Sequence, residues 1–332
     1  MVSSTHPTHP DDLAAALAAW GLEAAAVTPL PGASDDRWQV AREDATFVLR
    51  RYRAPSMDAI AYEHDLLAFL AEHAWPVTVP VAAPDGATLV EAADAAWVLS
   101  PALPGAMPPD ESIFLQRRGA LLALVHADLA AWEHPAPRER AVRVDDFDAA
   151  VRDHGLGSFE ALLARVQAVD GRSANALAVV RARIDEQLEA YHYDELPVMP
   201  LWGACTANHV LFDGNDVTGL LNFDGARVDA RIVDVATSIL ADTRRVGWRI
   251  IRWVAGYAVH ASPPLTEREA DLVPVVMAAL TLGRTARALA ETYAAGRLDA
   301  EALAPVEDAL TIEAQEGDIR QVIRTAARLA PV

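Results

Sequence analysis

The sequence predicts a two-lobed α+β protein, in which a small antiparallel β-sheet precedes a larger helical region. Short alternating apolar segments are concentrated in the first part of the chain, a stretch with four prolines follows, and helical patterns dominate the rest. A chain of 332 residues is long enough for two such lobes. We therefore expect an N-lobe over residues 1–100, a hinge over 101–110 and a C-lobe over 111–332.

The N-lobe pattern begins with a helix at 11–20, whose first turn is acidic and so suits the helix dipole. Segments 37–41 and 46–52 alternate polar and apolar residues. This alternation predicts an antiparallel pair, with the turn at Glu43 and Asp44.

A second N-lobe helix is expected from Ser56, which can cap its amino end. Two further strands are predicted at 87–91 and 96–100. The apolar residues of the helix recur at helical spacing, and they are Ile60, Leu66, Leu67 and Leu70.

The C-lobe pattern is helical apart from one predicted hairpin. Two apolar runs flank the turn Asp213–Asp216, which contains an Asp-Gly pair typical of a hairpin, and the second run covers 217–223. The expected helices cover 112–133, 158–169 and 174–192, and the chain is helical again from Ile232.

Composition excludes several classes of function. The net charge of −19 makes nucleic acid and anionic membranes poor partners. All 28 basic residues are arginine, so neither a Schiff-base lysine nor a phosphate-loop lysine is possible. No apolar run has the length of a membrane span, the start of the chain lacks the pattern of a signal peptide, and Cys205 is the only cysteine. These features predict a cytoplasmic protein.

Residues 201–224 contain a small-residue loop, Trp202-Gly-Ala-Cys-Thr-Ala-Asn-His209, followed by the hairpin and by Asn222-Phe-Asp224. This stretch resembles the catalytic loop and metal motif of the small-molecule phosphotransferases, which include aminoglycoside phosphotransferases, choline kinases and type II homoserine kinases. The resemblance implies a protein-kinase-like fold, ATP and Mg²⁺ as cofactors, and a small-molecule substrate with an alcohol group as acceptor.

The resemblance also assigns roles to individual positions. The loop Asp that acts as base corresponds to Ala204, and the metal-binding Asp of the second motif corresponds to Asn222. A methyl group accepts no proton, and an amide brings no charge to a metal. His209 and Asp224 are the residues that could still hold the metal.

Upstream and downstream positions match in order. Arg50 stands where the family has a strand lysine, and Glu63 follows it in the next helix, so both are candidates for the nucleotide site. Asp234 matches an Asp that braces the catalytic loop by hydrogen bonds. Arg50 and Glu63 have an alternative interpretation as a structural ion pair, and His126 is interpreted as a core histidine.

Three functions follow from these assignments. The first is an active small-molecule kinase that uses Asp224 and His209 for Mg²⁺. The second is a pseudokinase that binds a small molecule or a protein without turnover. The third is a different enzyme in the same cleft, an idea supported by Trp202, which stands where the family usually has His and makes the cleft more apolar. Cys205, next to the missing Asp, could be a nucleophile if the pKa of its thiol were lowered, although a small inert filler is the simpler interpretation. We favour a phosphotransferase-family protein that is catalytically impaired or inactive.

The acceptor and the oligomeric state are left open by the sequence. Asp145, Asp146 and Asp148 form an acidic run that could suit a cationic acceptor. The alternative is an ordinary solvated surface, as expected for a chain of this charge.

Overall fold

The computed structural model describes residues 10–30, 36–43, 45–52, 57–92, 95–134, 143–203 and 205–328. Contacts between Cα atoms divide the chain into two compact units. The sheet unit contains the described residues up to Pro108 together with Asn208–Asp224. The helical unit contains Pro109–Ala207 and the residues from Gly225 onward.

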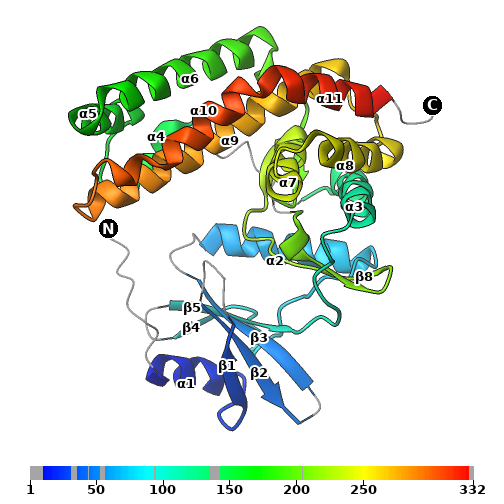
Figure 1. Cartoon of the computed structure of the whole chain (residues 1–332). Coiled ribbons are helices and arrows are strands. Elements are labelled where there is room, and N and C mark those ends of the chain that lie inside the picture. Colours follow the sequence, from blue (N-terminus) through cyan, green and yellow to red (C-terminus); the bar gives the residue numbers. More distant parts are fainter. Residues whose placement is uncertain are drawn as a thin grey trace. The chain divides into compact units, whose positions relative to one another are not determined.

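The sheet unit is built on a five-stranded antiparallel sheet with the strand order β1-β2-β3-β5-β4 (Figure 1). Helix α1 (Pro10–Ala18) precedes the sheet, and α2 (Met57–Glu72) connects β3 to the later strands. The strands are β1 (Ala26–Pro29), β2 (Asp36–Arg42), β3 (Ala45–Tyr52), β4 (Val90–Ala92) and β5 (Ala95–Pro101).

The two faces of this sheet have different roles because side chains alternate along each strand. One face packs on Ala16 and Leu17 of α1, and its centre is the pair Trp38 and Trp97, whose ring centroids lie 5.6 Å apart. Leu49 is fully buried in the same cluster. The opposite face therefore carries the other half of each strand, and it is there that the candidate site lies.

The hairpin of β7 (Val210–Asp213) and β8 (Asp216–Leu220) belongs to the sheet unit. Phe212 and Ala106 exchange two backbone hydrogen bonds of 2.8 and 2.9 Å, and the Leu220 N–H donates to the Pro76 carbonyl at 2.8 Å. The stretch 201–224, expected within the C-lobe, is divided between the two units: residues 201–207 belong to the helical unit and Asn208–Asp224 to the sheet unit. The bonds of the hairpin to Ala106 and Pro76 join it to segments that are far from it in the sequence.

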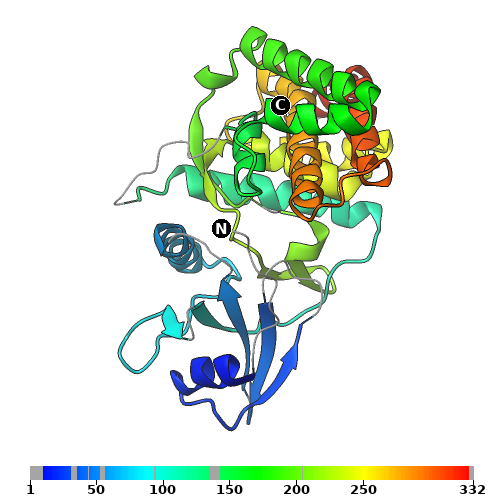
Figure 2. The same ribbon diagram turned by 90° about the vertical axis from the view of Figure 1, so that its left-hand side faces the viewer.

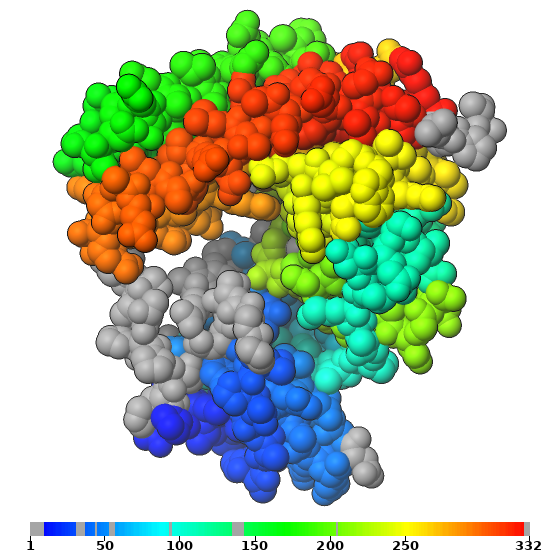
Figure 3. Space-filling view, viewed as in Figure 1, coloured from blue at the N-terminus to red at the C-terminus, as the bar shows by residue number. Residues whose placement is uncertain are grey.

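The helical unit is arranged around α9 (Glu267–Ala294), which packs against six other helices of the unit. Figure 2 shows these helices from the side, and Figure 3 shows α10 and α11 in orange and red beside the green α5 and α6. The other helices are α3 (Ser112–Ala130), α4 (Phe147–Arg152), α5 (Phe159–Val169), α6 (Gly171–Ala190), α7 (Ile232–Thr243), α8 (Gly247–His260), α10 (Pro305–Ala314) and α11 (Glu316–Arg328). The unit also contains an antiparallel pair of strands, β6 (Val198–Leu201) and β9 (Arg227–Ala230).

Helix α9 is the one described helix that is long and apolar enough to cross a membrane, judged by length and composition. Within its most apolar window, 67% of the residues are buried inside the structure. This burial is what the core helix of a helical domain requires.

The fold class predicted from the sequence is confirmed: a small antiparallel sheet and a mainly helical region form an α+β protein. Three short strands were not predicted: β1, β6 and β9. The strand expected at 87–91 covers only Val90–Ala92, because the Ala83 N–H donates to the Ala87 carbonyl and so closes a turn.

Other predicted boundaries shift for local reasons. The second strand of the hairpin ends at Leu220 rather than at 223, because Asn222 adopts a left-handed φ of 65°. Helix α6 begins at Gly171 rather than at 174, since the Asp170 side chain accepts hydrogen bonds from the first free N–H groups. Asp44 and Ser56, the predicted turn and cap residues, lie outside the described residues.

Candidate functional site

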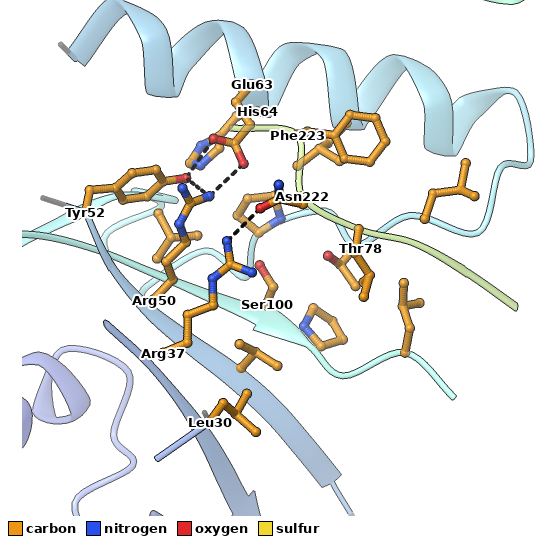
Figure 4. Close-up of a pocket in the computed structure, with 18 residues that line it drawn as sticks. Leu30, Arg37, Arg50, Tyr52, Glu63, His64, Thr78, Ser100, Asn222 and Phe223 are labelled. Atoms are coloured by element: carbon orange, nitrogen blue, oxygen red, sulfur yellow. Dashed lines mark hydrogen bonds and ion pairs between the residues drawn. The ribbon is translucent and has the colours of Figure 1, made fainter. Parts of the chain in front are cut away.

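A cavity of about 200 Å³ lies in the sheet unit, on the face of the sheet opposite α1 (Figure 4). In the strand ladders Arg37 is opposite Arg50, and Arg50 is opposite Val98. Residues directly opposite each other project from the same face, so β2, β3 and β5 all line the cavity. Its walls are mainly apolar, with Leu30, Val48, Leu67, Leu103 and Leu220 among the lining residues.

Arg50 and Glu63 form the ion pair that the sequence predicted as one of two interpretations. Arg50 Nη1 lies 3.0 Å from Glu63 Oε1, and both side chains are largely buried. The Tyr52 hydroxyl donates to Glu63 Oε2 at 3.1 Å, and the Arg50 guanidinium lies 4.0 Å from the Tyr52 ring centroid. Strand β3 supplies Arg50 and Tyr52 from one face, and α2 supplies Glu63 (Figure 4).

Asn222 and Asp224 follow β8 and reach two different guanidinium groups. Arg37 Nη2 donates to Asn222 Oδ1 at 3.0 Å, and Arg50 Nη2 lies 3.3 Å from Asp224 Oδ2. Asn222 lines the cavity, with Phe223 beside it (Figure 4). Asn is among the few residues that tolerate the left-handed backbone found at this position.

The structure brings four of the six predicted site residues together: Arg50, Glu63, Asn222 and Asp224. The carbonyl of His209 accepts the Leu221 N–H at 2.8 Å, and His209 is not among the described residues that line the cavity. Ala204 lies outside the described residues.

Burial shifts the ionisation of three groups at the cavity. Desolvation raises the pKa of Glu63, while the neighbouring Arg50 opposes this shift. Desolvation also lowers the pKa of His64 to about 4, so its ring is neutral at pH 7. The pKa of the Tyr52 hydroxyl rises well above its ordinary range, because the side chain is buried next to Glu63.

The donor set here differs from that of a metal site. Among the described residues, no group of three or more His, Cys, Asp or Glu side chains has the arrangement to hold a metal ion. The Asn222 oxygen accepts from one guanidinium, and Asp224 is paired with another. Asn222 and Asp224, two of the three predicted metal ligands, are therefore oriented toward cations that the chain itself supplies.

The small-residue loop at 202–207 belongs to the helical unit, where two buried carboxylates of α7 brace it. Asp234 accepts backbone hydrogen bonds from Trp202 and Gly203 at 3.0 and 2.9 Å, which confirms the predicted bracing role. Eight residues further along α7, Asp242 accepts from the Ala207 N–H at 2.9 Å and pairs with Arg118.

His126 and Cys205 are both buried in the interior of the helical unit. His126 is buried, with Nδ1 2.8 Å from the Tyr257 hydroxyl and Nε2 3.2 Å from Asp234, as expected for a core histidine. Cys205 is fully buried, and desolvation raises the pKa of its thiol well above the ordinary value. A thiol in this environment is not an activated nucleophile.

Arg37, Tyr52 and His64 line the cavity but belong to none of the motifs that predicted the site, although the sequence carries a signal for each of them. The predicted turn at 43–44 already places Arg37 opposite Arg50 in the ladder. Tyr52 is two residues beyond Arg50 in the same strand, and His64 is the neighbour of Glu63. For the two strand residues, the strand register and the alternation of side chains along each strand place them on the same face of the sheet as Arg50.

A small antiparallel sheet with a buried Arg–Glu pair, a braced loop and a following hairpin define a kinase-like small-molecule phosphotransferase fold. The family model described as "Phosphotransferase enzyme family" matches residues 26–272. The chain belongs to this family.

Solved structures with the same fold include small-molecule kinases. A microcompartment-associated aminopropanol kinase has a TM-score of 0.70 at 20% identity, with 94% of this chain and 97% of that chain covered. Amicoumacin kinase, solved with AMP-PNP and Ca²⁺, has a TM-score of 0.63 at 14% identity over 92% and 90% of the two chains. A choline/ethanolamine kinase family protein from Mesorhizobium loti has a TM-score of 0.62 at 12% identity, with 95% of this chain and 99% of that chain covered. No curated protein matches the chain.

Proposed function

We propose that this chain is a small-molecule-binding member of the phosphotransferase family whose magnesium-dependent phosphoryl transfer is lost or strongly reduced. The observation that carries this proposal is the hydrogen bond of 3.0 Å from Arg37 Nη2 to Asn222 Oδ1. At the position where the family resemblance expects a metal-binding carboxylate, this chain has a neutral amide whose oxygen accepts from a cation.

Magnesium is a poor fit to the residues present. Mg²⁺ requires oxygen ligands in nearly ideal octahedral geometry and is usually held by carboxylates. Here Asn222 brings no charge, and Asp224 lies 3.3 Å from the guanidinium of Arg50. A divalent cation between these residues has two arginines as neighbours, and like charges at such distances repel strongly in a partly buried site. A magnesium-dependent catalytic step is therefore not part of the proposed function.

The missing base also lowers the expected rate of phosphoryl transfer. Phosphoryl transfer needs a residue that orients or deprotonates the acceptor hydroxyl, and the matching position is Ala204. Loss of a general base alone typically costs about 10²–10⁴ in rate. Together with the altered metal position, this loss supports a protein that binds its ligand without efficient turnover.

An adenine nucleotide is the ligand that the cavity supports best. Apolar side chains from three strands form its walls, while Arg37, Arg50 and Asn222 form a polar end. This division suits a molecule with a flat apolar part and a polar or anionic tail. The solved amicoumacin kinase contains AMP-PNP, so a protein of the same fold binds a molecule of this class.

The first experiment measures binding and turnover separately. Thermal-shift titration with ATP is carried out in EDTA and in Mg²⁺, and ADP release is measured with aminopropanol, choline and ethanolamine as acceptors. We expect stabilisation by ATP without a requirement for Mg²⁺, and no ADP release above the rate without protein. Rapid acceptor-dependent ADP release would contradict the proposal.

The second experiment restores the two carboxylates. The double variant Ala204→Asp/Asn222→Asp should gain stabilisation by ATP that depends on Mg²⁺, because it returns one carboxylate to the family's base position and one to its metal position. Ala204→Asn serves as the control, since it adds similar volume without charge. Equal behaviour of both variants in Mg²⁺ would count against the alignment of residues 204 and 222 with the family motifs.

A further inference from the structure

Two buried nitrogen atoms at the cavity have no hydrogen-bond partner among the residues that the structure describes: Arg37 Nε and His64 Nε2. Both residues line the cavity, one from β2 and the other from α2 (Figure 4). Buried polar atoms are nearly always paired, because an unpaired donor loses its water without replacement. Arg37 Nε–H can only donate, so the part of the cavity next to it is suited to a ligand with hydrogen-bond acceptors. His64 Nε2 donates or accepts according to the tautomer of its ring.

The charges at the cavity are unevenly balanced. Arg50 lies within ion-pair distance of two carboxylates, at 3.0 Å from Glu63 and 3.3 Å from Asp224. Arg37 forms no ion pair with a described residue, and its hydrogen bond goes to the neutral amide of Asn222. Among the described residues, Arg37 is therefore less fully matched by carboxylates than Arg50 is, since Glu63 acts on Arg37 only through a longer-range electrostatic attraction.

We propose that Arg37 takes the place of the divalent cation and binds the phosphate of an adenine nucleotide directly. This inference rests on the proposed function and adds the chemistry of recognition at the same site. The hydrogen bond to Asn222 fixes the guanidinium, and Nε–H with the remaining Nη hydrogens faces the phosphate oxygens. A planar guanidinium suits this task because it offers several donors in a fixed fork.

The identity of residue 222 bears on the same phosphate site. An aspartate at this position would pair with Arg37 and neutralise the positive charge that attracts the phosphate. An asparagine of the same shape holds the guanidinium by a hydrogen bond and leaves its charge available. In this interpretation Asn222 is a positioning residue for Arg37 rather than a weakened metal ligand.

The experiment compares adenosine, ADP and pyrophosphate by calorimetry in EDTA and in Mg²⁺. In EDTA, we expect the wild-type chain to bind ADP at least about tenfold more tightly than adenosine. Adding Mg²⁺ should change its affinity for ADP by less than about threefold. Arg37→Gln should reduce ADP binding to the level of adenosine and leave adenosine itself unchanged. Arg42→Gln is the matched control, because Arg42 lies on β2 but donates to the Gly21 carbonyl on the other face.

Several results would overturn the inference. ADP binding that requires Mg²⁺, or an unchanged preference for ADP in Arg37→Gln, would remove Arg37 from its role. Pyrophosphate that binds as tightly as ADP would overturn the assignment to a nucleotide.

A second variant keeps the test decisive if Arg37→Gln does not fold. Asn222→Asp should lower ADP affinity in EDTA by about tenfold and leave adenosine binding unchanged, because a carboxylate would neutralise Arg37. Tighter ADP binding by this variant in EDTA would contradict the proposal. If the wild-type chain bound neither adenosine nor any nucleotide, that result would contradict the proposed function as well. If it bound adenosine and ADP equally tightly, that result would contradict this inference alone.

Discussion

The Asp234 carboxylate accepts a hydrogen bond from the backbone N–H of Gly203, with 2.9 Å between N and Oδ1. Its other oxygen accepts from the Trp202 N–H at 3.0 Å, so one buried side chain fixes two consecutive peptide groups. Gly203 itself has a φ of 90°, a backbone conformation that residues other than glycine rarely adopt. Asp234 and the backbone of Gly203 therefore fix the start of this loop.

Replacement of Gly203 tests how strongly the loop depends on this conformation. A Cβ atom at residue 203 would lie 2.3 Å from the Gly225 carbonyl oxygen, which is backbone and cannot move aside cheaply. We expect Gly203→Ala to destabilise the protein by at least about 2 kcal/mol, or roughly 4 °C or more in the unfolding midpoint. Differential scanning calorimetry measures the shift.

Gly157→Ala is the control for this variant. Gly157 is exposed, and a Cβ atom there would meet nothing within 4 Å. Its unfolding midpoint should stay within about 1 °C of the wild-type value. A shift of the same size in both variants would show that the strain at Gly203 is not the cause.

The sequence was sufficient for the fold class and for part of the site. Arg50, Glu63, Asn222 and Asp224 were found because each lies in a short motif or at a fixed place beside one. Arg37 was not found, since it belongs to no motif and reaches the site only through the β2–β3 register. That register follows from the predicted turn, so the residue could have been found by geometry.

Other features depend on contacts that sequence spacing does not encode. Asp242 braces the Ala207 N–H from a position 35 residues away, and only the packing of α7 brings the two together. The left-handed backbone of Asn222, which ends the strand early, is likewise set by its surroundings. Asparagine permits this conformation but does not by itself predict it.

The ionisation of His64 gives a prediction for stability against pH. Burial lowers the pKa of its ring to about 4, from an ordinary value of 6.5. The unfolded chain therefore binds a proton at a higher pH than the folded chain does. The stability from the neutral ring is fully present above pH 6.5 and is lost as the pH falls toward 4.

A neutral substitute separates this effect from general acid unfolding. Between pH 7.5 and 4.5, the wild-type chain should lose about 1–3 kcal/mol more than His64→Gln, measured by urea unfolding. His73→Gln is the control, because His73 follows α2 but is exposed. This control should follow the wild-type pH dependence. Parallel curves for wild type and His64→Gln would contradict the shifted pKa.

The last prediction concerns Cys205, the only cysteine of the chain. Its side chain is fully buried, its sulfur lies 3.8 Å from the Arg118 carbonyl oxygen, and desolvation raises the pKa of its thiol well above the ordinary value. Thiol reagents attack the thiolate, so the folded protein should react at least about a hundredfold more slowly than the protein in denaturing urea.

Time-dependent labelling with a chromogenic disulfide reagent at pH 8 measures this rate. The control is Cys205→Ser/Ala314→Cys, which moves the single cysteine to an exposed position on α10 and should react rapidly without denaturant. Labelling of the native wild-type chain should follow its unfolding rate as urea is added, because the thiol becomes accessible only when the helical unit opens. Rapid labelling without denaturant would contradict the burial of Cys205, and it would restore the thiol as a candidate nucleophile for chemistry other than phosphoryl transfer.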